Sequence, residues 1–118
     1  MGKINLLDVD YDIRDHIFHV SIGRPRRGIA SLNLADLLTA VSLDKKTGDV
    51  VGWIVHDFPE TNGRRLPLSL APDAPAIELR HRHGRVTGVL HGEQLFDIPL
   101  IAGRQDVKVF DWSALAAS

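Results

Sequence analysis

Residues 40 to 54, AVSLDKKTGDVVGWI, align without a gap on residues 76 to 90, AIELRHRHGRVTGVL. Each copy contains an apolar-alternating segment, a four-residue polar connection that ends at Gly48 or Gly84, and a second alternating segment. Alternation with a period of two, interrupted by polar residues and a glycine, is typical of a β-hairpin. The internal repeat therefore predicts a chain built from two similar hairpins.

The second segment of each hairpin shares apolar residues and glycines at alternate positions. They are Val50, Gly52 and Ile54 in one copy and Val86, Gly88 and Leu90 in the other. Alternate residues of a strand lie on one face, so we predict that these residues face the core and that Trp53 points to the opposite side. A glycine at the shared position would let a backbone or a large side chain lie close to the sheet.

The rest of the chain adds further short strands. Alternating segments predict strands over 3–9, 16–22, 93–101 and 106–112. Asn33 and the leucines that follow it predict one short helix near 33–41. Residues 59–76 hold four of the six prolines and predict a loop between the two repeats. We expect a single, mainly β domain over 1–118, an antiparallel or rolled sheet of about seven or eight strands.

The composition excludes several classes of function. The chain has 14 Lys and Arg against 15 Asp and Glu, so no overall field attracts nucleic acid or an anionic membrane. It has no cysteine, which excludes thiol catalysis, disulfides and thiolate metal sites. No apolar run approaches the roughly 20 residues of a membrane span. We therefore expect a cytoplasmic protein that does not enter a membrane.

Two motifs carry a resemblance to a known family. The first contains Tyr11, Asp12, Asp15, Phe18 and Val20, and the second contains Leu43, Asp44, Gly48, Val50, Val51, Gly52, Trp53 and Ile54. They resemble a family of small bacterial domains of unknown function, with the motifs Y-D-x-x-x-D-x-L-Y-I and G-x-V-V-G-I-E-I. The chain departs from this pattern at "DHIFHV" and at the glutamate that follows Gly52 in the family.

The resemblance covers roughly residues 9 to 57. It implies a small β-sheet domain and supplies no catalytic residue. It also hints at an antitoxin-like or other partner-binding role.

Two patterns contain possible metal ligands. Asp8, Asp10 and Asp12 have the spacing that begins a calcium loop, but Ile13 and His19 occupy the positions of its essential glycine and glutamate. We therefore predict that these aspartates belong to a turn. His81 and His83 would share one face of a strand, and His91 could supply a third ligand for a divalent transition metal. We favour the interpretation that His81 and His83 are exposed residues at a hairpin end, and the metal site is the alternative.

Basic residues form three clusters in predicted loops or hairpin ends, at Arg24, Arg26 and Arg27, at Arg64 and Arg65, and at Arg80, Arg82 and Arg85. If they converge, they would make an anion-binding or nucleic-acid patch. No recognition helix, zinc-finger spacing or aromatic-rich strand accompanies them, which argues against nucleic acid.

The chain has no complete catalytic set, so the sequence favours a non-catalytic module and leaves enzymatic activity open. We predict a protein-interaction or regulatory module without a cofactor. It would bind a protein partner or self-associate as a homo-oligomer, by pairing sheet edges or by burying Trp53 and Trp112, with Arg26 and Arg27 at the interaction surface. The alternative is a metal-binding or small-molecule-binding protein or enzyme that uses His81, His83 and His91.

Overall fold

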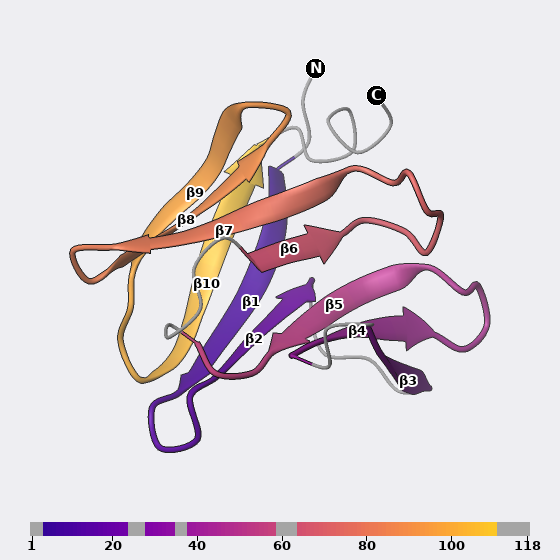
Figure 1. Ribbon diagram of the computed structural model, residues 1–118, viewed down its shortest axis with the longest axis horizontal. Coiled ribbons are helices and arrows are strands. Elements are labelled where there is room, and N and C mark those ends of the chain that lie inside the picture. Colours follow the sequence, from indigo (N-terminus) through magenta and orange to yellow (C-terminus); the bar gives the residue numbers. More distant parts are fainter. Residues whose placement is uncertain (1–3, 24–27, 35–37, 59–63, 111–118) are drawn as a thin grey trace.

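The computed structural model describes residues 4–23, 28–34, 38–58 and 64–110, which form ten strands in two antiparallel sheets (Figure 1). The six-stranded sheet has the order β10 (Gly103–Phe110), β1 (Ile4–Asp12), β2 (Ile17–Ile22), β5 (Val50–Val55), β4 (Thr39–Asp44), β3 (Ile29–Asn33). The four-stranded sheet has the order β6 (Arg64–Pro67), β7 (Ala76–Arg82), β8 (Arg85–Leu90), β9 (Glu93–Pro99). The mainly β, antiparallel prediction is confirmed, with β3 and β6 as strands that it did not include.

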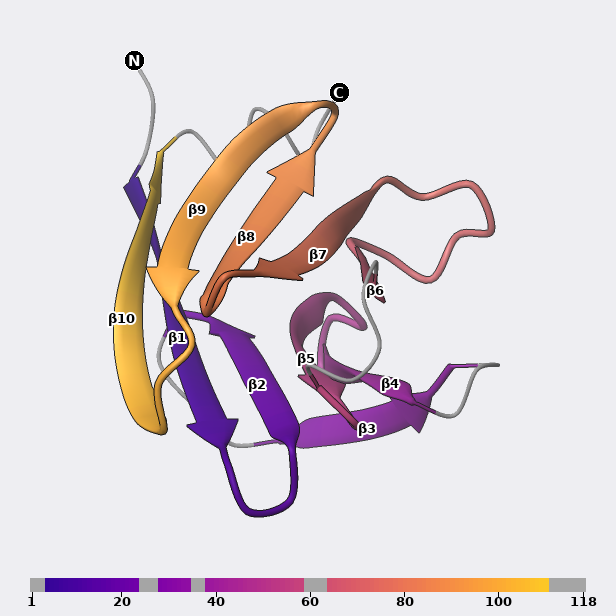
Figure 2. The same ribbon diagram turned by 60° about the vertical axis from the view of Figure 1, so that its left-hand side comes forward.

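The inner faces of the two sheets share one hydrophobic core. Leu7, Val9 and Tyr11 of β1 belong to the same buried cluster as Ile77 and Leu79 of β7. The chain passes from one sheet to the other between β5 and β6 and returns between β9 and β10, which lie side by side in Figure 2. A side-chain hydrogen bond spans each passage. Trp53 Nε1 donates to the Pro67 carbonyl at 2.8 Å, and Gln105 Nε2 donates to the Pro99 carbonyl at 2.9 Å.

Both predicted hairpins form, as β4–β5 and β7–β8, but their connections differ. Five residues, 45–49, join β4 to β5, whereas only His83 and Gly84 join β7 to β8. The prediction of one shared four-residue connection is therefore wrong. Aligned residues also pair differently, because Ser42 lies opposite Gly52 whereas Leu79 lies opposite Gly88.

The β4–β5 turn instead resembles the turn between β1 and β2. Asp44 Oδ1 accepts hydrogen bonds from the amides of Lys46 and Thr47, and Gly48 follows with a φ of 76°. Asp12 Oδ1 accepts hydrogen bonds from the amides of Arg14 and Asp15, and His16 follows with a φ of 55°. An aspartate that bonds the amides two and three residues on stabilises such a turn. The predicted turn role is thus confirmed for Asp12 and is wrong for Asp8 and Asp10, which lie within β1.

The core face predicted for β5 is wrong. Val50 is in the core, but the next core residues are Trp53 and Val55, while Ile54 is half-buried on the outer face. The cause is a β-bulge, because Ser42 pairs with Gly52 whereas Leu43 pairs with Val50. The extra residue, Val51, shifts the alternation by one position. In β8 the prediction holds, since Val86, Gly88 and Leu90 are all buried.

The close approach predicted at the two shared glycines is confirmed. A Cβ atom at Gly52 would lie 2.7 Å from the Val20 carbonyl oxygen of the adjacent strand. A Cβ atom at Gly88 would lie 2.3 Å from Cε2 of Phe96, whose buried ring covers the glycine from β9. One glycine therefore makes room for a backbone and the other for a large side chain.

The helix predicted near 33–41 is wrong at both ends. Asn33 ends β3 and Thr39 begins β4, while residues 35–37 lie outside the described part of the chain. The Leu34 amide donates to the Thr39 carbonyl at 2.8 Å, which extends the antiparallel ladder to the start of this connection. Leu34 and Val41, two of the apolar residues with helical spacing, thus lie on the two arms of a hairpin.

The loop predicted over 59–76 contains a strand. β6 pairs with β7 from Arg64 opposite Leu79 to Pro67 opposite Ala76, and Ala76 already belongs to β7. Proline is tolerated here because β6 is an edge strand and needs bonds on one side only. The described loop is therefore only 68–75, and residues 59–63 lie outside the described ranges.

We expect Gly88→Ala to lower the free energy of unfolding by about 1–3 kcal/mol, because the new methyl group overlaps the buried Phe96 ring. Urea denaturation measures this loss. The double variant Gly88→Ala, Phe96→Leu should lose less free energy of unfolding than the sum of the losses of the two single variants, because the smaller side chain leaves room for the methyl group. A Gly88→Ala variant as stable as the native protein would contradict this packing.

Candidate functional site

Two of the predicted metal ligands are turn residues. His83 and Gly84 have φ values of 52° and 72° and connect β7 to β8, and His91 and Gly92 have φ values of 51° and 78° and connect β8 to β9. Two-residue hairpin connections with positive φ at both positions are type I′ turns, in which Asn-Gly is the usual pair. His83 and His91 therefore stand where asparagine is common.

The structure does not bring the three predicted histidines together. The six residues of β8 separate His83 from His91, a distance of about 20 Å at the usual rise of a strand. His81 lies in β7, half-buried, with its ring centroid 6.1 Å from that of Phe58. Among the described residues, no group of three or more histidines and carboxylates could hold a metal ion.

The residues predicted for a protein interface have different positions. Trp53 is 1% exposed and is part of the core, so its side chain offers no surface to a partner. Trp112, Arg26 and Arg27 lie outside the described residues, as does Arg24.

Four arginines of the predicted basic clusters converge on the outer face of the four-stranded sheet. We call this surface the arginine face and define it by Arg65, Arg80, Arg82 and Arg85. Arg65 is exposed whereas its neighbour Arg64 is buried, because adjacent residues of β6 point to opposite sides. The strand register places Arg65 opposite Glu78 and Arg82 opposite Arg85. Two of the predicted clusters thus contribute to one surface.

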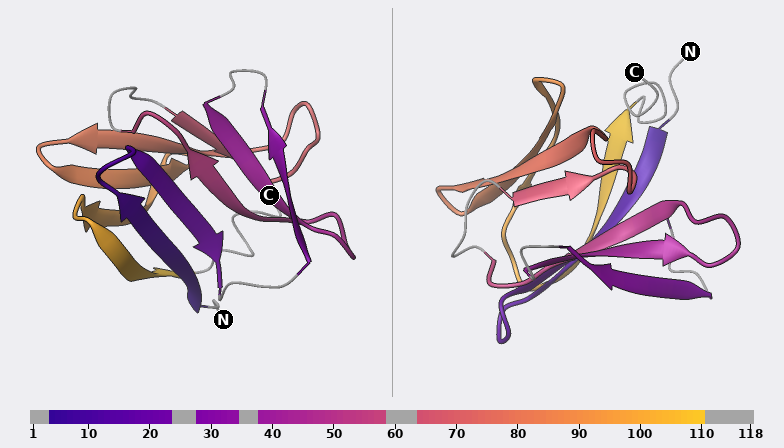
Figure 3. Two further views of the ribbon diagram at one scale, coloured as in Figure 1. Left: turned by 90° about the horizontal axis from the view of Figure 1, so that it is seen from below. Right: turned by 45° about the vertical axis from the view of Figure 1, so that its right-hand side comes forward.

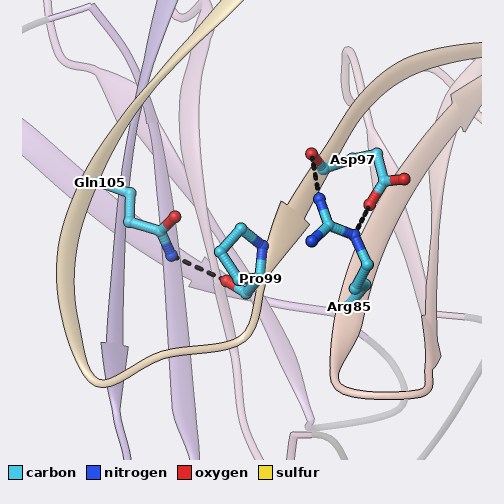
Figure 4. Close-up of polar contacts among 4 residues, drawn as sticks. All are labelled: Arg85, Asp97, Pro99 and Gln105. Atoms are coloured by element: carbon cyan, nitrogen blue, oxygen red, sulfur yellow. Dashed lines mark hydrogen bonds and ion pairs between the residues drawn. The ribbon is translucent and has the colours of Figure 1, made fainter.

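Carboxylates organise part of the arginine face. Arg80 Nε lies 3.0 Å from Glu78 Oε1, and this contact lowers the pKa of Glu78 and raises that of Arg80. Arg85 bonds both the carboxylate of Asp97, at 2.7 Å, and its backbone carbonyl, at 3.3 Å (Figure 4). These pairs are exposed and add little stability, so their main effect is to orient the two guanidinium groups.

The guanidinium groups of Arg65 and Arg82 make no hydrogen bond or ion pair with a side chain in the described part of the chain. Arg65 still contributes to the lowered pKa of Glu78 through its charge. With four arginines against Glu78 and Asp97, the face carries a net positive charge in a chain whose total charge is −1.

A shallow groove of about 390 Å³ lies beside Arg65 and Arg80 on the arginine face. Its lining residues come from β6, β7, β8 and the turns beside them, and they are Arg65, Pro75, Ala76, Glu78, Arg80, Val89, Leu90, His91 and Gly92. Apolar side chains thus accompany charged ones, which suits an extended segment with both acidic and apolar residues.

The outer face of β1 and β10 has the opposite character. Asp8 lies opposite Asp106, and Asp10 lies opposite Arg104. The Arg104 guanidinium donates hydrogen bonds to both oxygens of the nearly buried Asp8 carboxylate. Asp8 and, to a smaller extent, Asp106 and Asp10 raise the pKa of Arg104. Arg104 therefore offsets the repulsion between these aspartates.

Comparisons of the chain with protein-family models, with curated proteins and with solved structures find no match. Its function is therefore inferred from the residues and their geometry. No helix in the described residues is long and apolar enough to cross a membrane.

Sequence reasoning favoured a turn role for His83 but placed His91 on a strand, and it did not anticipate that β6 would place Arg65 opposite Glu78. A signal for the turns exists, since each His-Gly pair stands between two alternating segments, as Asn-Gly does in tight hairpins. The position of Arg65 has no comparable signal, because it depends on the pairing of β6 with β7.

We expect His83→Asn and His91→Asn each to raise the free energy of unfolding by about 0.5 kcal/mol, because asparagine adopts positive φ more readily than histidine. Thermal and urea denaturation measure the gain. His81→Asn is the control and should lower stability through lost packing on Phe58. If zinc or nickel stabilises the native protein, and the substitutions at His83 and His91 abolish this effect, the turn interpretation is incomplete.

Proposed function

We propose that the protein is a non-catalytic protein-interaction module that binds an acidic segment of a partner protein on the arginine face. The observation that carries this proposal is the presence of four arginines from β6, β7 and β8 on one sheet face, two of which, Arg65 and Arg80, line a groove. Two of them, Arg65 and Arg82, have their guanidinium groups available for carboxylates of a partner.

The pKa shifts of the described residues have a structural cause. The pKa shifts of Glu78, Arg80 and Arg104 all arise mainly from surface ion pairs. Catalytic acids and bases usually have a pKa shifted by burial or by close charges inside a cleft. The shifts of these three groups have a different cause, since they arise from the exposed Arg80–Glu78 pair and from the Arg104–Asp8 pair.

The pattern of side chains favours a protein over a nucleic acid. Glu78 and Asp97 stand among the arginines and would repel a continuous phosphate backbone. The outward-facing residues that the structure describes on β6, β7 and β8 include no aromatic ring for base stacking. Mixed charges with Val89 between them instead match a protein segment of complementary charge.

Binding of this kind is expected to be transient and sensitive to salt, because exposed charges steer association and are screened within about 10 Å at 0.1 M ionic strength. By binding its partner, such a module would regulate the partner's activity, as in the antitoxin-like role that the family resemblance suggests.

A fluorescein-labelled peptide rich in glutamate and leucine tests the proposal by fluorescence anisotropy. We expect measurable binding by the native protein and a dissociation constant about tenfold higher for Arg82→Glu, since the new carboxylate repels the peptide. Lys46→Glu, the same charge change in the β4–β5 turn, is the matched control and should leave binding unchanged.

Equal peptide affinity for all three proteins would rule out the arginine face as the binding surface. A single-stranded oligonucleotide of equal length serves as the second probe. If it binds more tightly than the peptide and loses affinity in Arg82→Glu, the partner is a nucleic acid and the proposal fails.

A further inference from the structure

The outer edge of β3 is a second interaction surface, in the other sheet. β3 ends the six-stranded sheet, and no other described strand pairs with its free side. Figure 3 shows β3 at the margin of this sheet in both views. An edge strand presents unpaired amides and carbonyls to the surroundings and can pair with another chain.

Sheet edges in natural proteins are commonly protected by charged residues or proline. Three of the strands that end the sheets have such protection: β6 contains Arg64, Arg65 and Pro67, β9 contains Glu93, Asp97 and Pro99, and β10 contains Arg104, Asp106 and Lys108. β3 reads Ile-Ala-Ser-Leu-Asn and has neither a charge nor a proline. Leu32 is 46% exposed, so this edge strand presents an apolar side chain near its free side.

The hydrogen bonds at the ends of β3 fix which residues point outward. The Leu34 amide donates to the Thr39 carbonyl at 2.8 Å, and the Gly28 carbonyl accepts from the Lys45 amide at 2.9 Å. The register between β3 and β4 has no shift. Because bonded and non-bonded pairs alternate along an antiparallel ladder, residues 30 and 32 bond to β4. The amides and carbonyls of residues 29, 31 and 33 therefore point to the free side.

We propose that two copies of this chain associate by antiparallel pairing of β3 with β3, about a two-fold axis at Ser31. In this register Ser31 exchanges hydrogen bonds with Ser31 of the second copy, and Ile29 does so with Asn33 of the second copy. These are the residues whose backbone groups point outward. The interface is isologous and closed, so it produces a dimer with one continuous sheet.

The side chains fit the same register. Ala30 and Leu32 lie on the inner side of the strand, opposite Leu43 and Val41 of β4. In the dimer Leu32 of each copy lies opposite Ala30 of the other, in a non-hydrogen-bonded pair where side chains approach most closely. A large residue thus meets a small one, and no like charges meet. This self-complementarity is the reason to assign the free edge to a second copy.

The dimer is expected to be weak, because pairing of one short strand buries less than the roughly 1,200 Å² of a standard stable interface. It is also independent of the arginine face, which belongs to the other sheet. Loss of self-association would therefore leave acidic-peptide binding intact, and failure of either proposal can be recognised separately.

Sedimentation velocity over a range of protein concentrations tests the dimer. We expect reversible dimerisation of the native chain and at least a tenfold lower association constant for Ser31→Pro, which removes an outward amide without removing a bond to β4. Ser31→Thr keeps the amide and is the matched control. A native protein that stays monomeric at every concentration, or a folded Ser31→Pro variant that associates as strongly as the native chain, would overturn the proposal.

A second variant tests the register, whether or not Ser31→Pro folds. The chain has no cysteine, so Ser31→Cys carries a single nitroxide label, and Thr47→Cys in the β4–β5 turn is the comparison. At a concentration where the dimer forms, electron paramagnetic resonance should give a shorter label-to-label distance for Ser31→Cys than for Thr47→Cys. The reverse order, or no dipolar coupling in either variant, would contradict pairing about Ser31.

Discussion

Phe58 fixes the point at which the chain leaves one sheet for the other, and the relative position of the two sheets depends on it. Its amide donates to the His16 carbonyl at 2.9 Å, and its carbonyl accepts from the Tyr11 hydroxyl at 3.2 Å. Its ring lies 4.8 Å from that of Phe18 on β2 and 6.1 Å from that of His81 on β7. Both its backbone and its ring thus connect the passage to β6 with the β1–β2 hairpin.

The interior strands could be predicted from the sequence because they alternate around a core, as Val86, Gly88 and Leu90 do. The two strands that the sequence did not predict, β3 and β6, are both edge strands. An edge strand needs fewer apolar residues and tolerates a proline such as Pro67, so its pattern is weak. The core position of Trp53 could not be predicted from the sequence either, because the bulge at Val51 arises from the pairing between β4 and β5.

The candidate site was predictable in residue type but not in geometry. The arginine clusters were evident, yet their convergence depends on the register of β6, β7 and β8. Spacing alone allowed His83 and His91 to share a metal ion, whereas the positive φ of each places it in a turn at one end of β8. The His-Gly pairs between alternating segments signal these turns only weakly, because histidine adopts positive φ in a minority of cases.

The two proposed surfaces use different sheets, so the two-sheet scaffold would allow self-association through β3 while the arginine face stays open to a partner. Amide hydrogen exchange, followed residue by residue by NMR at low and high protein concentration, tests the proposed self-association through β3 most directly. It predicts that the amides of Ala30 and Leu32 are protected at both concentrations and that those of Ile29, Ser31 and Asn33 become protected only at the high one. Rapid exchange of these three amides at every concentration would contradict it.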